Sequence, residues 1–356
     1  MSDLPKILFL LYGHSYNVIL LESIYGVFKI RIMNVRNEKM QLLFNIFVVS
    51  ICTLLSVSSY AYSAAEQEPI NAQQTSQQCF SKTWGRAELN ELKAKQFTLT
   101  DTETRQELAI QLLHCLAHPE PTIRDGIAFE ALSHWLRSNE LSPEIQIKMF
   151  NSLIKVLSTP INDANDVYQS FAMLVVSELA RSDRKKTYLS VNERNELVNV
   201  GTSYLKSVRD YRGFSNDVGW RHGVAHSADL MLQLALNPNI SSVQLDLMLG
   251  ALSSQIQANN LHAYIHGEPK RLAVAVIYIF LNSDYKGTDW SVWLNSIAEP
   301  KPFNDWSEVY QSEKGLIKLH NTQNFLNALY ALVKPSKHEK LVTMVTPIEK
   351  ALKQVQ

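Results

Sequence analysis

The chain has 356 residues, and its 34 Lys and Arg balance 34 Asp and Glu, so its formal net charge is zero. The longest basic run, Arg184–Lys186, has three residues and is predicted to be a solvated helix end, which argues against nucleic-acid binding through a Lys/Arg-rich face. Hydrophobic residues make up 46% of the chain, which is long enough for a substantial core.

The N-terminal region carries the pattern of an export signal. Leu42–Val57 is an apolar run that follows Arg36 and Lys39, and a small-x-small cleavage pattern ends at Ser63. We therefore predict a signal peptide over residues 40–65, which would place the protein in the periplasm or outside the cell. The alternative is a membrane anchor, because the run approaches the ~18 residues that span a bilayer.

Residues 1–39 do not fit a signal peptide, whose charged end comes first. They contain an apolar, aromatic stretch at Ile7–Ile32. We expect translation to begin at Met33 or Met40, which would make the upstream residues an extension outside the mature protein. If they are translated, two hydrophobic N-terminal segments would tether the chain to a membrane.

Residues 66–78 are polar and Gln-rich, which predicts a flexible linker ahead of one all-helical domain over residues 79–356. Two cysteines lie in the predicted mature chain, Cys79 and Cys115. In an oxidising compartment they would form a disulfide, and the alternative is two free thiols. The absence of a CxxC pattern argues against a thioredoxin motif and a cysteine zinc site.

Helix signals recur along the domain. Thr100–Glu103 is read as a capping box, Ser142 as an N-cap before Pro143, and Ser190–Glu193 as a second capping box. Apolar residues at helical spacing predict further helices, with these bounds: Ile123–Leu136, Val167–Leu179, Val243–Ile256, Lys270–Leu281, Trp290–Ile297, Thr322–Val333 and Lys337–Val355.

Ten or more helices joined by short loops predict antiparallel helix pairs. The pairs recur at roughly 40 residues, which is the spacing of HEAT-like repeats. We therefore predict an all-α fold in which the pairs form an α-solenoid or curved helical array. A closed α/α toroid is the alternative, and it would enclose a central pocket where a solenoid has a concave face.

The segment 210–230, DYRGFSNDVGWRHGVAHSADL, concentrates the residues suited to chemistry. Gly213 and Gly219 predict a tight turn that aims the next helix, with Asn216 or Asp217 serving the N-terminus of that helix. The candidate ligand-binding residues in this segment are Arg212, Trp220, His222, His226 and Asp229.

Three of these residues share one face if a helix begins near Gly219, because His222, His226 and Asp229 then stand at i, i+4 and i+7. This spacing suits a divalent metal site, a ligand site without metal, or hydrogen bonds to neighbouring helices. Gly223 follows His222, so the glutamate base of an HExxH motif is absent and a zincin protease is disfavoured.

Two more charged groups are candidates. Glu268 and Arg271 open an otherwise apolar helix, and because an isolated buried charge is costly, we expect Glu268 to reach His222 or Arg212, or to cap its own helix. Arg124 and Asp125 either belong to a site, together with Glu130, or bridge adjacent repeats. Tryptophans are candidates for a sugar- or peptide-binding cleft, or for the core: Trp135, Trp220, Trp290, Trp293 and Trp306.

These blocks also resemble a known family. The run from RGF through GW to HxxxHxAD is similar to the pattern of the bacterial family called domain of unknown function 2785. IRDGIAFEALSHWL at Ile123–Leu136 and EPKRLA at Glu268–Ala273 are similar to its other blocks. The resemblance covers roughly residues 80–340. It implies an all-helical fold and a shortlist of residues, but no reaction.

We therefore hold three hypotheses for the function. The first is a secreted helical-repeat protein that binds a protein partner or a small-molecule ligand around the 210–230 segment and Glu268. The second is a hydrolase, either metal-dependent through His222, His226 and Asp229 with Glu268 or Asp125 as base, or a carboxylate-pair glycosidase in a toroid. The third is that all of these residues only pack helices together.

Overall fold

The computed structural model describes residues 7–12, 15–24, 27–35, 68–257 and 262–355, and the chain divides into two compact units, Met1–Gln67 and Glu68–Gln356. In the first unit, an antiparallel sheet of order β1-β2-β3 is formed by β1 (Ile7–Tyr12), β2 (Ser15–Ile24) and β3 (Val27–Val35). The predicted signal peptide at 40–65 lies outside the described residues. Within the described parts of the chain, no helix combines the length and apolarity needed to cross a bilayer.

The second unit is mostly helical and begins where a flexible linker was predicted. Ile70–Asn71 (β4) pairs in parallel with Ile161–Asn162 (β5), and Ala72–Gln77 (α2) follows with the Asn71 side chain accepting the Gln74 N–H at 3.1 Å. The Cys79–Cys115 disulfide is formed directly after α2. From residue 70 on, pairing, capping and a cross-link therefore order a segment whose Gln-rich composition predicted a linker.

The remaining helices agree with most of the sequence expectations. Ser142 and Ser190 cap their helices as predicted, but Asp101 rather than Thr100 caps the first of the core helices, by accepting the Thr104 N–H at 2.7 Å. The helix predicted at Ile123–Leu136 contains a π-helical turn, η1 (Arg124–Phe129). In chain order the helices are α3 (Arg86–Ala94), α4 (Thr102–Cys115), α5 (Pro121–Ile123), α6 (Glu130–Arg137), α7 (Pro143–Ser158), α8 (Tyr168–Lys185), α9 (Val191–Ser207), α10 (Gly223–Ala235), α11 (Ser242–Ile256), α12 (Glu268–Leu281), α13 (Trp290–Ile297), α14 (Trp306–Val309), α15 (Glu313–Val333) and α16 (Glu339–Gln354).

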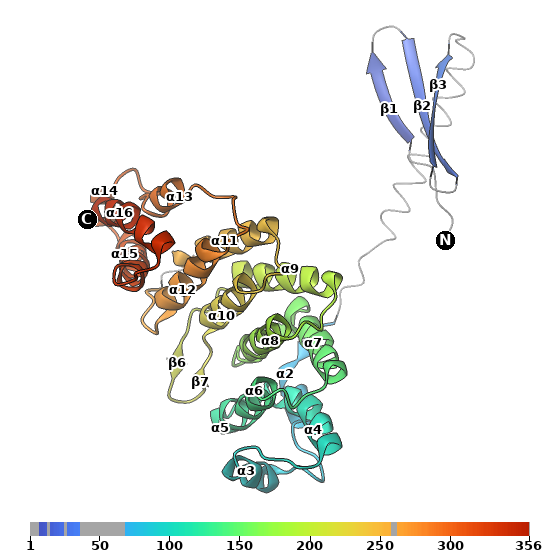
Figure 1. Cartoon of the computed structure of the whole chain (residues 1–356), viewed down its shortest axis with the longest axis vertical. Helices are drawn as coiled ribbons and strands as arrows, with labels where there is room; N and C mark the ends of the chain where they lie inside the picture. Colours follow the sequence, from blue (N-terminus) through green and yellow to red (C-terminus); the bar gives the residue numbers. More distant parts are fainter. Residues whose placement is uncertain (1–6, 13–14, 25–26, 36–67, 258–261, 356) are drawn as a thin grey trace. The chain divides into compact units, whose positions relative to one another are not determined.

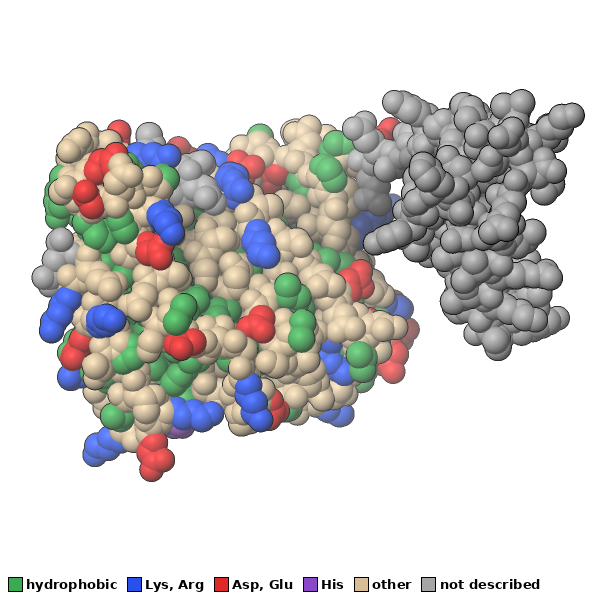
Figure 2. Space-filling view, turned by 90° about the horizontal axis from the view of Figure 1, so that it is seen from above, with side chains coloured by type: hydrophobic (Ala, Val, Ile, Leu, Met, Phe, Trp, Pro, Cys, Tyr) green, Lys and Arg blue, Asp and Glu red, His purple; other side chains and the backbone are tan. Residues whose placement is uncertain are grey.

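These helices pack in two layers (Figure 1). In one layer α4, α7, α9 and α11 contact each other in that order, and in the other α6, α8, α10, α12 and α15 do so. Contacts between consecutive helices, such as α7 with α8 and α9 with α10, join the layers. The core lies between them and includes Trp135, Phe150 and Phe325. Figure 2 shows basic and acidic side chains interspersed on one face, in keeping with the balanced charge.

In the 210–230 segment, the helix that was expected to begin near Gly219 begins later. Phe214–Ser215 (β6) and Gly219–Trp220 (β7) form an antiparallel hairpin, and α10 begins only at Gly223. Gly219 and His222 have φ values of 72° and 59°, which a helix cannot accommodate. The predicted turn is present, but Asn216 and Asp217 lie in the hairpin turn, and α10 has no side-chain cap.

Candidate functional site

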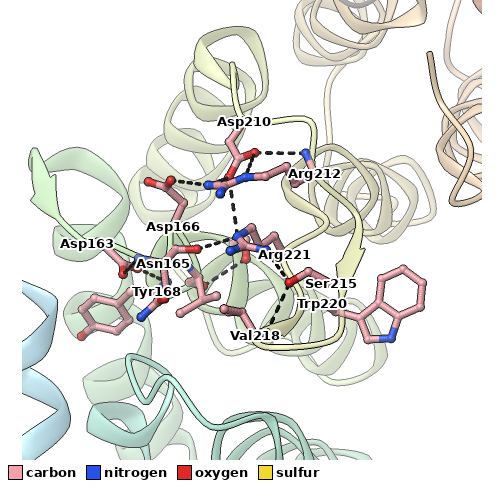
Figure 3. A network of polar contacts seen from close by, with 12 residues as sticks. Asp163, Asn165, Asp166, Tyr168, Asp210, Arg212, Ser215, Val218, Trp220 and Arg221 are labelled. Carbon is pink, nitrogen blue, oxygen red and sulfur yellow. Dashed lines mark hydrogen bonds and ion pairs between the residues drawn. The ribbon is translucent and has the colours of Figure 1, made fainter. Parts of the chain in front are cut away.

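A polar cavity of about 180 Å³ lies where the loop before α8, the C-terminal end of α9 and the residues around the hairpin meet (Figure 3). We call it the polar cavity. Six of the side chains that line it bear acidic, basic or phenolic groups from three separate segments: Asp163, Asp166, Tyr204, Arg209, Asp210 and Arg221.

The loop before α8 supplies two carboxylates. Asp163 accepts the backbone N–H groups of Asn165, Val167 and Tyr168 at 2.9, 2.8 and 2.8 Å. It therefore satisfies donors at the start of α8, where backbone N–H groups have no partner within the helix. Asp166 adopts a left-handed conformation, with φ of 54°, which turns the chain into α8.

An arginine joins Asp166 to the other side of the polar cavity. Arg212 donates from Nη2 to Asp166 at 2.6 Å and to Asp210 at 2.7 Å. Burial raises the pKa of Asp166, the negative charge of Asp210 raises it further, and Arg212 partly offsets both effects. The two carboxylates are therefore close enough to repel each other, and Arg212 holds them together.

Arg221 fastens the hairpin to the same loop. Its buried guanidinium donates to the Asn165 carbonyl oxygen at 2.7 Å and to the Ser215 hydroxyl at 3.1 Å. Tyr204 of α9 completes the wall, and burial raises the pKa of its phenol, with Asp210 and Asp166 adding to the effect. The shape of the polar cavity thus depends on contacts between residues about 50 positions apart in the chain.

The predicted approach of Glu268 to His222 is present beside this cavity. His222 Nε2 lies 3.5 Å from Glu268 Oε1 and 3.1 Å from the His266 carbonyl oxygen, and Glu268 also accepts the His266 N–H at 3.0 Å. Burial by itself would raise the pKa of Glu268, but hydrogen bonds from His222 and the backbone outweigh it and lower the pKa. Trp220 stacks on the imidazole of His222 with ring centroids 4.7 Å apart.

The residues proposed as metal ligands have other partners. His226 is buried, and its Nδ1 lies 2.9 Å from the Ser170 carbonyl oxygen. Burial, with the charge of His222, lowers its pKa to about 3, so it is a neutral imidazole that donates from Nδ1. Asp229 pairs with Arg271 of α12. Among the residues that the structure describes, no three His, Cys, Asp or Glu side chains are grouped so that they could hold a metal ion.

A family model described as protein of unknown function (DUF2785) matches residues 153–331. The chain belongs to the DUF2785 family. This match includes the loop before α8, the hairpin, His222 and Glu268, so the whole polar cavity lies within the DUF2785 region. No curated protein and no solved structure matches the chain.

Two candidates, Arg124 and Asp125, lie outside the residues matched by the DUF2785 model, but Arg124 contacts the hairpin that lies within them. Arg124 is fully buried and donates to the carbonyl oxygens of Val218 at 2.7 Å and Pro119 at 3.1 Å, while its guanidinium lies over the Phe171 ring. Burial raises the pKa of Asp125 to about 6, although its pairing with Arg124 opposes the shift. Arg124 therefore bridges η1 to the hairpin, and it does not line the polar cavity.

The tryptophans are distributed among separate parts of the DUF2785 protein. Trp135 is buried and donates to the Phe97 carbonyl oxygen at 2.9 Å. Trp290 and Trp293 pack on each other, and Trp306 donates to the Ala298 carbonyl oxygen at 3.1 Å. Trp220 is the exposed member, on the hairpin. The five therefore do not line one cleft.

Sequence reasoning did not select Asp163, Asp166, Tyr204, Asp210 or Arg221. Asp210 and Arg221 lie inside the 210–230 segment, so the concentration of charged and aromatic residues in that segment did indicate their region of the chain. Asp163 and Asp166 stand in a loop with no motif, and only the fold brings them to the hairpin (Figure 3).

Proposed function

We propose that the helical unit is a binding module that takes up a small, neutral, hydroxyl-bearing ligand in the polar cavity. The observation that carries this proposal is the convergence of Asp166, Asp210 and Arg221 on one cavity, from the loop before α8 and the two ends of the hairpin segment. Carboxylates accept hydrogen bonds from ligand hydroxyls and guanidinium groups donate to them, so the walls offer both kinds of partner.

Charge and size narrow the ligand class. Three carboxylates (Asp163, Asp166 and Asp210) face three guanidinium groups (Arg209 and Arg221 in the wall, Arg212 behind it), which favours a neutral ligand over an ion. The volume of about 180 Å³ is below the roughly 300–1,000 Å³ of drug-sized ligand sites, which favours a small polyol or a single sugar. The hydrolase alternative is not favoured, because His222, His226 and Asp229 have separate partners.

We further propose that the two layers are a HEAT-like open array and that the protein is exported. The successive contacts α6–α8–α10–α12–α15 support the open array over a toroid. The disulfide between Cys79 and Cys115 supports an oxidising compartment.

The ligand proposal is tested by calorimetric titration with a panel of monosaccharides and polyols, followed by the variant Asp166→Asn. Asparagine tolerates the left-handed backbone at this position, so the fold should persist while a charged acceptor is lost. We expect binding about tenfold weaker, as for a lost charge-assisted hydrogen bond. Asp217→Asn, in the exposed hairpin turn, is the matched control and should bind as the parent does. Equal affinity of all three proteins would contradict the assignment.

A further inference from the structure

We propose that the solvent side of α6, α8, α10 and α12 binds an extended acidic peptide segment of a partner protein. These four helices are neighbours (Figure 1). A row of charged side chains crosses them through contacts of Arg137 with Glu178, Arg184 with Gln233 and Arg271 with Asp229, and we call it the arginine face. It consists of Arg137, Glu178, Arg181, Arg184, Asp229 and Arg271. The polar cavity adjoins the N-terminal end of α8, whereas this row crosses its C-terminal half, so the inference does not depend on the proposed function.

Two ion pairs join neighbouring helices, and in each the arginine is more exposed to solvent than the carboxylate. Arg137 of α6 donates to Glu178 of α8 at 2.9 Å, and Arg271 of α12 pairs with Asp229 of α10. The arginine side chains are 54% and 47% exposed, whereas the carboxylate side chains are only 8% and 23% exposed. A partner that approaches this face therefore meets guanidinium groups first.

Two further arginines of the row are held by no carboxylate at ion-pair distance among the residues that the structure describes. Arg181 and Arg184 stand one turn apart on α8, and within the described part of the chain neither forms an ion pair; Arg184 donates instead to the neutral amide of Gln233 at 2.8 Å. Burial lowers the pKa of Arg184, the adjacent positive charge of Arg181 lowers it further, and Tyr278 and Glu178 offset these effects only in part. An anion bound between Arg181 and Arg184 would stabilise the charged form of Arg184, because it would offset both the loss of solvent and the repulsion between the two guanidinium groups.

This geometry corrects one sequence expectation. Arg184 belongs to the short basic run that was predicted to be a solvated helix end, and Lys185 and Lys186 are indeed exposed. Arg184 is half-buried against α10 through its contact with Gln233. With four arginines and two carboxylates, the arginine face keeps an excess of positive charge.

The extent of the row selects a peptide over a single small anion. Packed helices lie 8–10 Å apart, so a row over four helices spans about 25–30 Å. An extended peptide advances ~3.3 Å per residue, so about eight residues cover it. Half-buried apolar side chains, including Leu174 of α8 and Leu232 of α10, lie on the same helices as the arginines. A segment that alternates acidic and apolar residues fits this surface.

The test uses the full chain and a fluorescein-labelled octapeptide that alternates glutamate and leucine, followed by fluorescence anisotropy. We expect saturable binding that weakens as salt is added, because exposed charge pairs are screened. Replacing both Arg181→Gln and Arg184→Gln should weaken binding about tenfold. The matched control, Lys185→Gln with Lys186→Gln, removes the same charge from the adjacent exposed positions and should change the affinity less than twofold.

Several results would overturn the proposal: no saturable binding to the parent, an equal loss in the two double variants, or equal binding of a peptide with glutamine in place of glutamate. Full displacement of the peptide by millimolar inorganic phosphate would assign a small-anion site instead. If the arginine double variant melts at a lower temperature than the parent, Arg181→Gln alone replaces it, with an expected loss of about threefold.

Discussion

His222 at the N-terminus of α10 and Glu268 at the N-terminus of α12 lie in contact, with Nε2 and Oε1 3.5 Å apart and both side chains buried. Because Nε2 also faces the His266 carbonyl oxygen, it faces two acceptors and therefore carries the proton. The contact joins two helix ends and positions Trp220, which stacks on the imidazole.

Glu268→Ala should therefore destabilise the fold by about 2–4 kcal/mol, because His222 and the His266 N–H lose a buried charged acceptor. The measurement is the free energy of urea unfolding at pH 7.5. Glu339→Ala is the control, since Glu339 also opens a helix but is exposed, and its loss should cost less than about 1 kcal/mol. A cost for Glu268→Ala of about 0.5 kcal/mol or less would contradict a structural role for the contact.

His226 should make the protein sensitive to acid. Its folded pKa of about 3 lies below the ordinary value of 6.5, so its contribution to stability is complete above pH 6.5 and is lost as the pH falls toward 3. Between pH 7.5 and 4.5 the parent should lose about 2–3 kcal/mol more than His226→Gln, which does not titrate and can still donate to Ser170. Unfolding titrations at the two pH values measure this difference, and parallel losses in both proteins would refute it.

Arg124→Ala should be among the most damaging substitutions. It removes a fully buried cation that holds carbonyl oxygens of the hairpin and of the loop before α5, and it leaves Asp125 unpaired. We expect a loss of about 3–5 kcal/mol in the free energy of unfolding. Arg86→Ala breaks an exposed ion pair with Glu120 and should cost less than about 1 kcal/mol. Similar costs for the two variants would show that Arg124 does not anchor the hairpin.

Replacing each of two glycines by alanine should change the stability of the protein in opposite directions. A β-carbon at Gly213 would lie 2.2 Å from His266 Nδ1 and 2.7 Å from His266 Cβ, so Gly213→Ala must displace the loop that carries His266 and should destabilise by about 1–3 kcal/mol. Gly250 is an exposed position in α11 where, among the described residues, a β-carbon meets no atom within 4 Å. Gly250→Ala should stabilise by about 0.5–1 kcal/mol. Thermal unfolding of both variants checks the signs.

The sequence by itself determined the helical architecture and several helix bounds. Ser142 and Ser190 mark helix starts, and the bounds of Trp290–Ile297 agree in full, because capping and apolar spacing act over only a few residues. The sequence also indicated that Glu268, a carboxylate that opens an apolar helix, needs a partner, but it left His222, Arg212 and the cap of its own helix open, and the structure shows the contact with His222.

Only the tertiary structure decided where α10 begins and which residues form the polar cavity. The hairpin replaces the expected helix start because Arg124 reaches Val218 across 94 positions and Gly213 packs against His266. Asp166 meets Arg212 across 46 positions, from a loop without a motif. Such contacts are set by the packing of distant segments, and no local pattern of residue types encodes which segments will meet.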